Sequence, residues 1–270
     1  MPVRTIHPIS GFVFAACLAA LSVPFAASAK ELPVDLELVL AVDISASISP
    51  DEQQLQRQGY VDAFRSSRVL KAVRSGAFGS IAVAYVEWAH AGYQKLVLPW
   101  TVIYSAESAG GFADALARAQ ISQSFGTSIS AALLFSLDLF EDNGYAGERR
   151  AIDLSANGAN NKGLPVRAAR NTVITDGVTI NGLPIMIHLS NNIIGLDFYF
   201  EDCVIGGPGA FQVPVKDPAE FAATIQRKLV LEIGSQLDRL IMPIAAEVER
   251  PLRMDCMAGE KFKGRLLPPD

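Results

Sequence analysis

Apolar runs of strand length alternate along this chain with stretches that carry apolar residues at helical spacing. The first run, Leu36 to Val42, is almost continuously apolar, which is typical of a strand buried on both faces of a parallel sheet. Regular alternation of strands and helices predicts a doubly wound α/β fold, in which helices cover both faces of a mostly parallel sheet. The pattern predicts strands over residues 36–45, 81–88, 94–103, 149–155, 178–187 and 210–215, and helices over 50–73, 108–120, 127–140, 164–174 and 219–234.

Two of the predicted strands are joined too closely for a parallel crossover. Residues 81–88 and 94–103 are separated only by a short turn around Ala91 and Gly92. A parallel pair needs a connection of a dozen or more residues, so we expect an antiparallel hairpin here. The sheet should therefore carry one antiparallel edge strand.

The first helix has a clear start signal directly after the first strand. Ser49 stands in the N-cap position, Pro50 follows at the first helical position, and Glu52 completes a capping box. The spacing of Leu55, Tyr60 and Phe64 predicts the face that this helix turns to the core.

Three oxygen-bearing side chains stand at the exit of the first strand. Alternate residues of an extended chain point the same way, so Asp43, Ser45 and Ser47 can converge on one point. Ligands in open α/β sheets bind outside the carboxyl ends of the strands, which is where this segment should lie. Hard oxygen donors without sulfur or imidazole suit Mg²⁺ or a similar cation rather than zinc. The alternative is that these residues only cap the helix that follows.

The motifs together resemble a von Willebrand factor A domain, and within that fold the bacterial DUF1194 family. The resemblance covers nearly the whole chain after its N-terminal segment, and it implies a metal-ion-dependent adhesion site. In such a site Ser and Thr hydroxyls bind Mg²⁺ (or Mn²⁺ or Ca²⁺) directly, acidic groups bind partly through water, and a protein partner's acidic residue fills the open position. The resemblance depends on residues 43–47, 126–129, 155–161, 179–185 and 204–211.

Carried over residue by residue, the resemblance predicts metal ligands at Asp43, Ser45, Ser47, Thr127 and Asn157. Thr127 has an alternative interpretation, because threonine is also common as a helix N-cap. The third position departs from the family pattern, since Asn157-Gly158 stands where the fold usually offers Asp-Gly. An amide oxygen carries no charge, so the site should bind its ion more weakly than one with two aspartates.

Two other aspartates compete for the third position. Asp153 shares a strand face with Asn157 but should lie roughly 13 Å deeper, so it remains the fallback, with a buried ion pair as its alternative role. Asp176 is the other candidate, because Thr175-Asp176-Gly177 matches the sequence that the family pattern has at the third position. This segment follows a predicted helix, however, and lies too many residues after Thr127.

The two ends of the chain carry separate signals. Arg4, the apolar segment 11–25 and the small residues 27–29 have the layout of a cleavable secretory signal, which predicts a periplasmic or secreted protein. The apolar stretch is short for a membrane span, so none is expected in the mature chain. We divide the chain into a signal peptide (1–29), the domain (30–235) and a C-terminal extension (236–270) packed on it. Cys203 and Cys256 would remain, as either a disulfide or two buried thiols.

Charge and motif content narrow the function further. A net charge of -5, with no basic stripe, argues against nucleic acid as a partner. No Gly-x-Ser-x-Gly motif is present, and His188 and Glu87 are the only bases that we can suggest near an ion. We therefore expect a non-enzymatic protein that binds a metal ion and a protein partner. A metal-assisted phosphoesterase and a degenerate, metal-free binding domain are the alternatives.

Overall fold

The computed structural model describes residues 1, 31–187, 195–234 and 253–262 of the 270-residue chain. The predicted signal peptide lies outside these residues apart from Met1, as do His188 and most of the predicted C-terminal extension. The elements in chain order are β1 (Leu32–Val34), β2 (Leu36–Asp43), α1 (Pro50–Arg65), α2 (Ser67–Val73), β3 (Ile81–Trp88), β4 (Gln94–Ile103), α3 (Ala106–Arg118), α4 (Ile129–Asp138), β5 (Tyr145–Gly147), β6 (Arg150–Ala156), α5 (Val166–Thr175), β7 (Thr179–Pro184), α6 (Leu196–Tyr199), the π-helical turn η2 (Phe200–Val204), the 3₁₀ turn η3 (Pro218–Glu220), α7 (Phe221–Gly234) and α8 (Ala258–Phe262).

The central sheet has five strands in the order β4-β3-β2-β6-β7. β2 pairs in parallel with β3 and β6, and β6 pairs in parallel with β7. β4 is antiparallel to β3 at one edge. The doubly wound α/β fold with one antiparallel edge strand is thus confirmed. A second sheet of two short strands, β1 and β5, was not predicted, because three residues are too few to show a periodicity.

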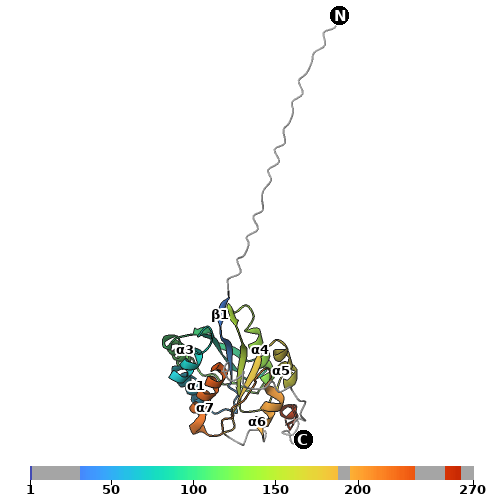
Figure 1. Ribbon diagram of the computed structural model, residues 1–270. Coiled ribbons are helices and arrows are strands. Elements are labelled where there is room, and N and C mark those ends of the chain that lie inside the picture. The colour runs from blue at the N-terminus through green and yellow to red at the C-terminus, as the bar shows by residue number, and fades with distance from the viewer. Residues whose placement is uncertain (2–30, 188–194, 235–252, 263–270) are drawn as a thin grey trace. The chain divides into compact units, whose positions relative to one another are not determined.

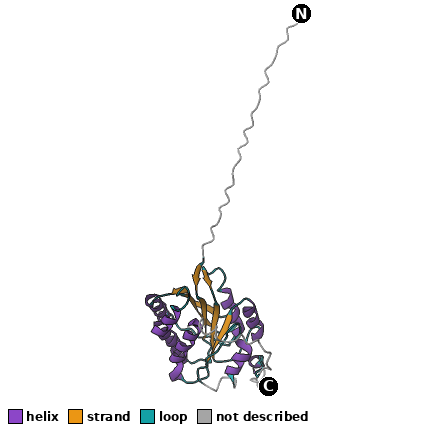
Figure 2. Ribbon diagram, in the orientation of Figure 1, coloured by secondary structure: helices purple, strands orange, loops and turns teal. Residues whose placement is uncertain are grey.

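Helices cover both faces of the sheet (Figures 1 and 2). On one face α1 lies between α3 and α7, and on the other α4 packs against α5. Every residue of β2 is buried, as its continuous apolar run predicted. Its side chains alternate between two cores: Leu38 and Leu40 face the α1 side, while Val39 and Ala41 face the α4 side. The end of β2 is therefore fixed by packing from both layers.

The capping box predicted at the first helix is present. The Ser49 hydroxyl accepts a hydrogen bond from the Glu52 N–H, and the Glu52 carboxylate accepts one from the Ser49 N–H. The single helix predicted to Val73 is wrong, because Ser66 has an extended backbone that ends α1 and caps α2. The predicted inward face is partly wrong too: Tyr60 is buried, as is Phe64, but Leu55 is exposed.

The predicted strand at residues 210–215 is also wrong, although the segment does run beside β7. Isolated bridges pair Gln212 with Gly182 of β7 and Val215 with Ile185 directly after β7, and the Val215 N–H donates to the Pro184 carbonyl at 2.9 Å. The glycine-rich segment before it forms a turn, in which Gly207 and Gly209 have positive φ angles of 93° and 68°. Within the described residues, no helix combines the length and apolarity that a bilayer crossing needs.

Candidate metal site

The side chains of the first motif lie together at the carboxyl edge of the sheet. Asp43 is the last residue of β2, and its Oδ1 accepts a 2.7 Å hydrogen bond from the backbone N–H of Ser45. The hydroxyl of Ser45 is hydrogen-bonded to that of Ser47 at 2.9 Å. The loop between β2 and α1 thus brings one carboxylate and two hydroxyls together at the end of the first strand, as predicted.

Asn157 joins the same cluster from the neighbouring strand. β6 runs parallel to β2 with Ser155 opposite Val42, so the two strands end side by side. The Ser47 hydroxyl donates a 2.8 Å hydrogen bond to Asn157 Oδ1 across 110 residues of sequence. A continuous chain of contacts therefore links four of the five predicted ligands.

Thr127 lies on a third loop that is fastened to the first. Ser124 forms a β-bridge with Ser45, and its N–H donates to the carbonyl of Ile44 at 3.2 Å. The N-cap of α4 is Ser128, whose hydroxyl accepts from the Ala131 N–H. The alternative role of Thr127 as the cap is therefore wrong. Thr127 itself is buried.

The electrostatics of Asp43 are unusual for a carboxylate. Its side chain is fully buried, and its Oδ2 accepts no hydrogen bond from any described residue. Burial raises the pKa of Asp43 to about 7, although the N–H and hydroxyl of Ser45 and the backbone N–H of Asn157 act to lower it. Buried polar atoms without a partner are rare and unfavourable in native proteins. A cation beside Oδ2 would satisfy this atom.

The donor set at this edge fits a hard cation. Hydroxyl, carboxylate and amide oxygens are the ligands that Mg²⁺ and Ca²⁺ prefer. In the described part of the chain, no three His, Cys, Asp or Glu side chains group so as to hold a metal. An ion at Asp43 would consequently depend on the serine, threonine and asparagine oxygens, with one formal negative charge.

The competing aspartates have other partners. Asp153 forms an ion pair of 2.5 Å with Lys228 of α7, both side chains being buried. That pairing is the alternative role expected for it. Asp176 caps the C-terminus of α5 and pairs with Arg150 at 3.2 Å. Neither residue belongs to the cluster around Asp43.

Sequence reasoning missed the residues that hold the loops of the site together. The Oδ1 of Asn161 accepts from the Thr127 N–H at 3.1 Å, and the Asn161 N–H donates to the Thr127 carbonyl at 2.8 Å. Asn160, fully buried, accepts a 3.0 Å hydrogen bond from the Ser130 N–H of α4. The asparagine-rich run after β6 was the available signal, because short amides commonly bond to nearby backbone.

The strand order and the helices on both faces of the sheet are those of the von Willebrand factor A fold. The family model described as "Protein of unknown function (DUF1194)" matches residues 33–237. The chain belongs to the DUF1194 family, as its motifs indicated. A search of curated proteins gave no match.

Solved structures of low sequence identity share the fold. Proximal thread matrix protein 1 of the mussel byssus is 16% identical, with a TM-score of 0.56 over 75% of this chain and 49% of that one. A second structure of the mussel protein, 15% identical with a TM-score of 0.56 over 75% and 48% of the two chains, has a zinc-occupied MIDAS motif. The pilus adhesin SpaC from Lactobacillus rhamnosus GG is 12% identical, with a TM-score of 0.53 over 75% and 31%. This chain thus spans half or less of the length of these proteins.

Proposed function

We propose that this protein binds a divalent metal ion at Asp43, Ser45, Ser47, Thr127 and Asn157, and uses the ion to hold an acidic residue of a protein partner. The single observation that carries the proposal is the buried Oδ2 of Asp43, which has no hydrogen-bond partner among the described residues yet lies in a cluster of hydroxyl and amide oxygens. Mg²⁺ is the ion that these donors suit best, with Mn²⁺ and Ca²⁺ as substitutes.

The same donor set argues for an acidic ligand from outside. Neutral hydroxyl and amide ligands leave half of the charge of a divalent ion uncompensated, because Asp43 supplies the one carboxylate among the proposed ligands. A carboxylate from a partner would supply the missing negative charge at an open coordination position. The mussel byssus protein, which shares the fold, has a zinc-occupied MIDAS motif, and this supports a proposal of metal binding by the present chain.

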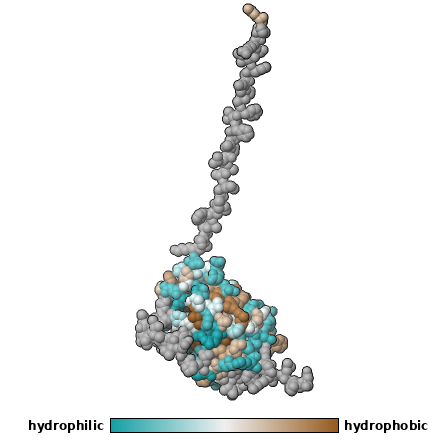
Figure 3. Space-filling model, turned by 90° about the vertical axis from the view of Figure 1, so that its right-hand side faces the viewer, coloured by the Kyte–Doolittle hydropathy of each residue, from teal (hydrophilic) through white to brown (hydrophobic). Residues whose placement is uncertain are grey.

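The surface beside the cluster supports a protein partner. Phe125, two residues before Thr127, leaves 81% of its side chain exposed. Exposed aromatic residues are enriched where proteins bind one another. The face drawn in Figure 3 mixes polar residues with separate apolar patches. We therefore place the partner at the carboxyl edge of the sheet.

We propose a binding protein rather than an enzyme. Of the two bases considered for the alternative, a metal-assisted phosphoesterase, Glu87 is buried in an ion pair with Arg57. Arg57 is itself held by the carbonyls of Leu116 and Ala119 at 3.0 and 2.9 Å. His188 lies outside the described residues. A phosphatase screen with Mn²⁺ tests the alternative, and turnover that is lost with the Asp43→Ala variant would favour it over our proposal.

We also propose that the protein is exported, to the periplasm or beyond, after removal of residues 1–29. The Cys203–Cys256 disulfide, with an S–S distance of 2.00 Å, supports an oxidising compartment. Expression of the full chain followed by N-terminal sequencing of the envelope fraction tests this point. A mature protein that begins at Lys30 is the expected result, and an intact Met1 in the cytoplasm would contradict it.

Isothermal titration with Mg²⁺ should show that Asn157→Asp binds the ion on the order of tenfold more tightly than wild type, since ligand charge is a main determinant of affinity. The added carboxylate would occupy the place of an amide oxygen that already accepts from Ser47. Asn171→Asp, on the exposed surface of α5, is the matched control and should leave the affinity unchanged. Binding by the variant alone, with none by wild type, would instead establish the degenerate, metal-free interpretation.

A further inference from the structure

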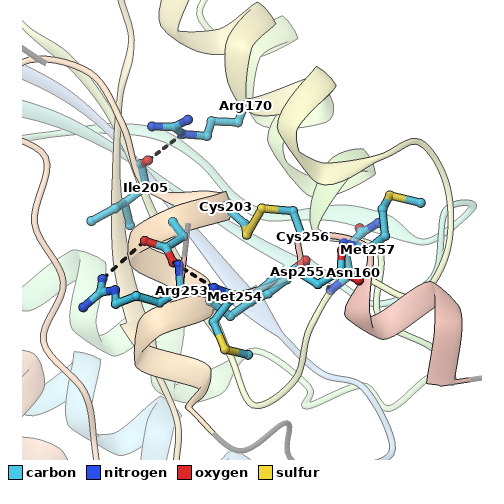
Figure 4. The surroundings of a disulfide bond; sticks show 11 residues. Asn160, Arg170, Cys203, Ile205, Arg253, Met254, Asp255, Cys256 and Met257 are labelled. Carbon is cyan, nitrogen blue, oxygen red and sulfur yellow. Dashed lines mark hydrogen bonds and ion pairs between the residues drawn. A yellow bond between two sulfur atoms is a disulfide. The ribbon is translucent and has the colours of Figure 1, made fainter. Parts of the chain in front are cut away.

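A disulfide fastens the short C-terminal segment of residues 253–262 to the domain. Cys256 of this segment is bonded to Cys203 of η2, 53 residues earlier, with 5.4 Å between the two Cα atoms (Figure 4). The backbone N–H groups of Arg253 and Met254 both donate to the buried carboxylate of Asp202, at 2.6 and 3.1 Å. The segment is therefore held on the domain by hydrogen bonds as well as by the disulfide.

The other end of the segment lies directly on the loop that follows β6. The Nδ2 of Asn160 donates a 2.7 Å hydrogen bond to the carboxylate of Glu260, in α8. Gly259 is buried so closely that a Cβ at this position would overlap the carbonyl oxygen of Asn160. Figure 4 shows Asn160 beside the segment, next to Met257 and Asp255. Contact between α8 and this loop is thus made through both side chain and backbone.

Asn160 connects this contact to the candidate metal site. Its Nδ2 also donates to the Leu164 carbonyl at 3.0 Å, and its Oδ1 accepts from the Ser130 N–H at 3.0 Å. It lies three residues after Asn157 and immediately before Asn161, which forms hydrogen bonds with both the N–H and the carbonyl of Thr127. One buried carboxamide therefore joins α8 to the loop that carries one predicted ligand and positions another.

We propose that the segment of residues 253–262, held by the Cys203–Cys256 disulfide, positions the loop of residues 157–161 and so sets the ion affinity of the site. Glu260 and Gly259 are positioning residues in this arrangement, because they act through Asn160 and do not touch the ion. The inference rests on the proposed function. Outer-shell partners of metal ligands typically change affinity by about 10- to 100-fold when they are removed.

Reduction of the disulfide is the change that would release the segment. A dithiol reductant attacks one sulfur as its thiolate, forms a mixed disulfide, and then closes to its own disulfide. The two cysteines receive two electrons and two protons and become thiols, while the reductant is oxidised. The segment would then keep its hydrogen bonds, ion pairs and apolar packing but lose its covalent link to η2. The loop should move more freely, and the ligands at Asn157 and Thr127 should be less well placed.

The test compares oxidised and dithiol-reduced full-length protein in two measurements. Isothermal titration with Mg²⁺ should show at least about tenfold weaker binding after reduction. Amide hydrogen exchange without metal should become faster at Ser130 and Asn161, whose N–H groups bond within this network, and stay unchanged at Val39 in the core of β2. The double variant Cys203→Ser/Cys256→Ser should behave as the reduced protein and show no further response to the dithiol.

Variants of the segment test the contact with the disulfide intact. Glu260→Ala and Gly259→Ala should weaken Mg²⁺ binding and speed the same exchange, while Glu260→Gln, which keeps an acceptor for Asn160, should restore both. Equal affinity in the oxidised, reduced and variant proteins, with binding itself intact, would overturn this inference alone. Failure of the oxidised wild type to bind Mg²⁺ would overturn the proposed function, and unchanged exchange would then refute the positioning role separately.

Discussion

Replacing Asp43 with asparagine should abolish Mg²⁺ binding while leaving the domain folded. The asparagine Oδ1 can still accept the 2.7 Å hydrogen bond from the Ser45 N–H, so the loop keeps its shape. What is lost is the only carboxylate of the cluster, and with it the charge that holds the ion. Outer-shell changes alone cost about 10- to 100-fold, so loss of this ligand should exceed 100-fold in isothermal titration.

The stability of the metal-free variant separates loss of a ligand from loss of the fold. Burial raises the pKa of Asp43 to about 7, so at pH 8 the wild-type protein holds a buried carboxylate without a cation. As pH rises from about 4 to 7, the unfolded chain loses this proton before the folded one, and the free energy of unfolding falls. The Asp43→Asn variant has no carboxyl group to titrate and so does not lose this stability. Its melting temperature at pH 8 should therefore equal or exceed that of wild type.

Asp62→Asn, on the exposed face of α1, is the matched control for this substitution and should change neither binding nor stability. Ion binding by Asp43→Asn within tenfold of wild type would contradict the proposed site. A large drop in its melting temperature would instead show that Asp43 is structural.

The parts of the fold that were predicted correctly are those determined by residues close together in the sequence. The continuous apolar run of β2 reflects burial from both faces, and Ser49 with Glu52 forms a cap that needs only neighbouring residues. The residues at the exit of β2 meet because adjacent parallel strands end at one edge. The cluster was therefore predictable once the strand order was guessed.

The features that escaped prediction depend on contacts between distant segments or on small energetic differences. Ser66 splits a helix whose apolar spacing continues through it. The disulfide state of Cys203 depends on the position of η2 relative to a segment 53 residues later. Asn160 gave only a composition signal, because its partners Ser130 and Glu260 come from α4 and α8. Periodicity carries no information about such pairings.

A buried network of ion pairs also joins distant segments, and we expect its disruption to lower the stability of the domain strongly. Lys228 of α7 is almost completely buried, 2.5 Å from Asp153 of β6 and 3.0 Å from Glu232 one turn along α7. Asn181 of β7 donates to the other oxygen of Glu232 at 2.7 Å. Burial raises the pKa of Asp153 to about 7, while the ammonium of Lys228 and its hydrogen bond act to lower it. One lysine therefore compensates two carboxylates inside the core.

Lys228→Met should lower the free energy of unfolding by about 3–5 kcal/mol, which is the usual cost of breaking a buried pair by removing one partner. Methionine fills much of the lysine volume, so the loss reports the two uncompensated carboxylates rather than a cavity. Urea denaturation followed by circular dichroism measures it. Arg227→Met, at the neighbouring exposed position of α7, should change stability by less than about 0.5 kcal/mol.

The pH dependence of this loss identifies its cause. Without the ammonium, the pKa of Asp153 should rise further, because the favourable charge that opposes burial is gone. The free energy of unfolding should therefore continue to fall above pH 7, where that of wild type levels off, because the folded variant keeps the Asp153 proton to higher pH. The difference between Lys228→Met and wild type should thus be smallest near pH 4 and largest above pH 7, and adding Asp153→Asn should recover part of it. A pH-independent loss would show that α7 depends on the packing of the lysine stem and not on its charge.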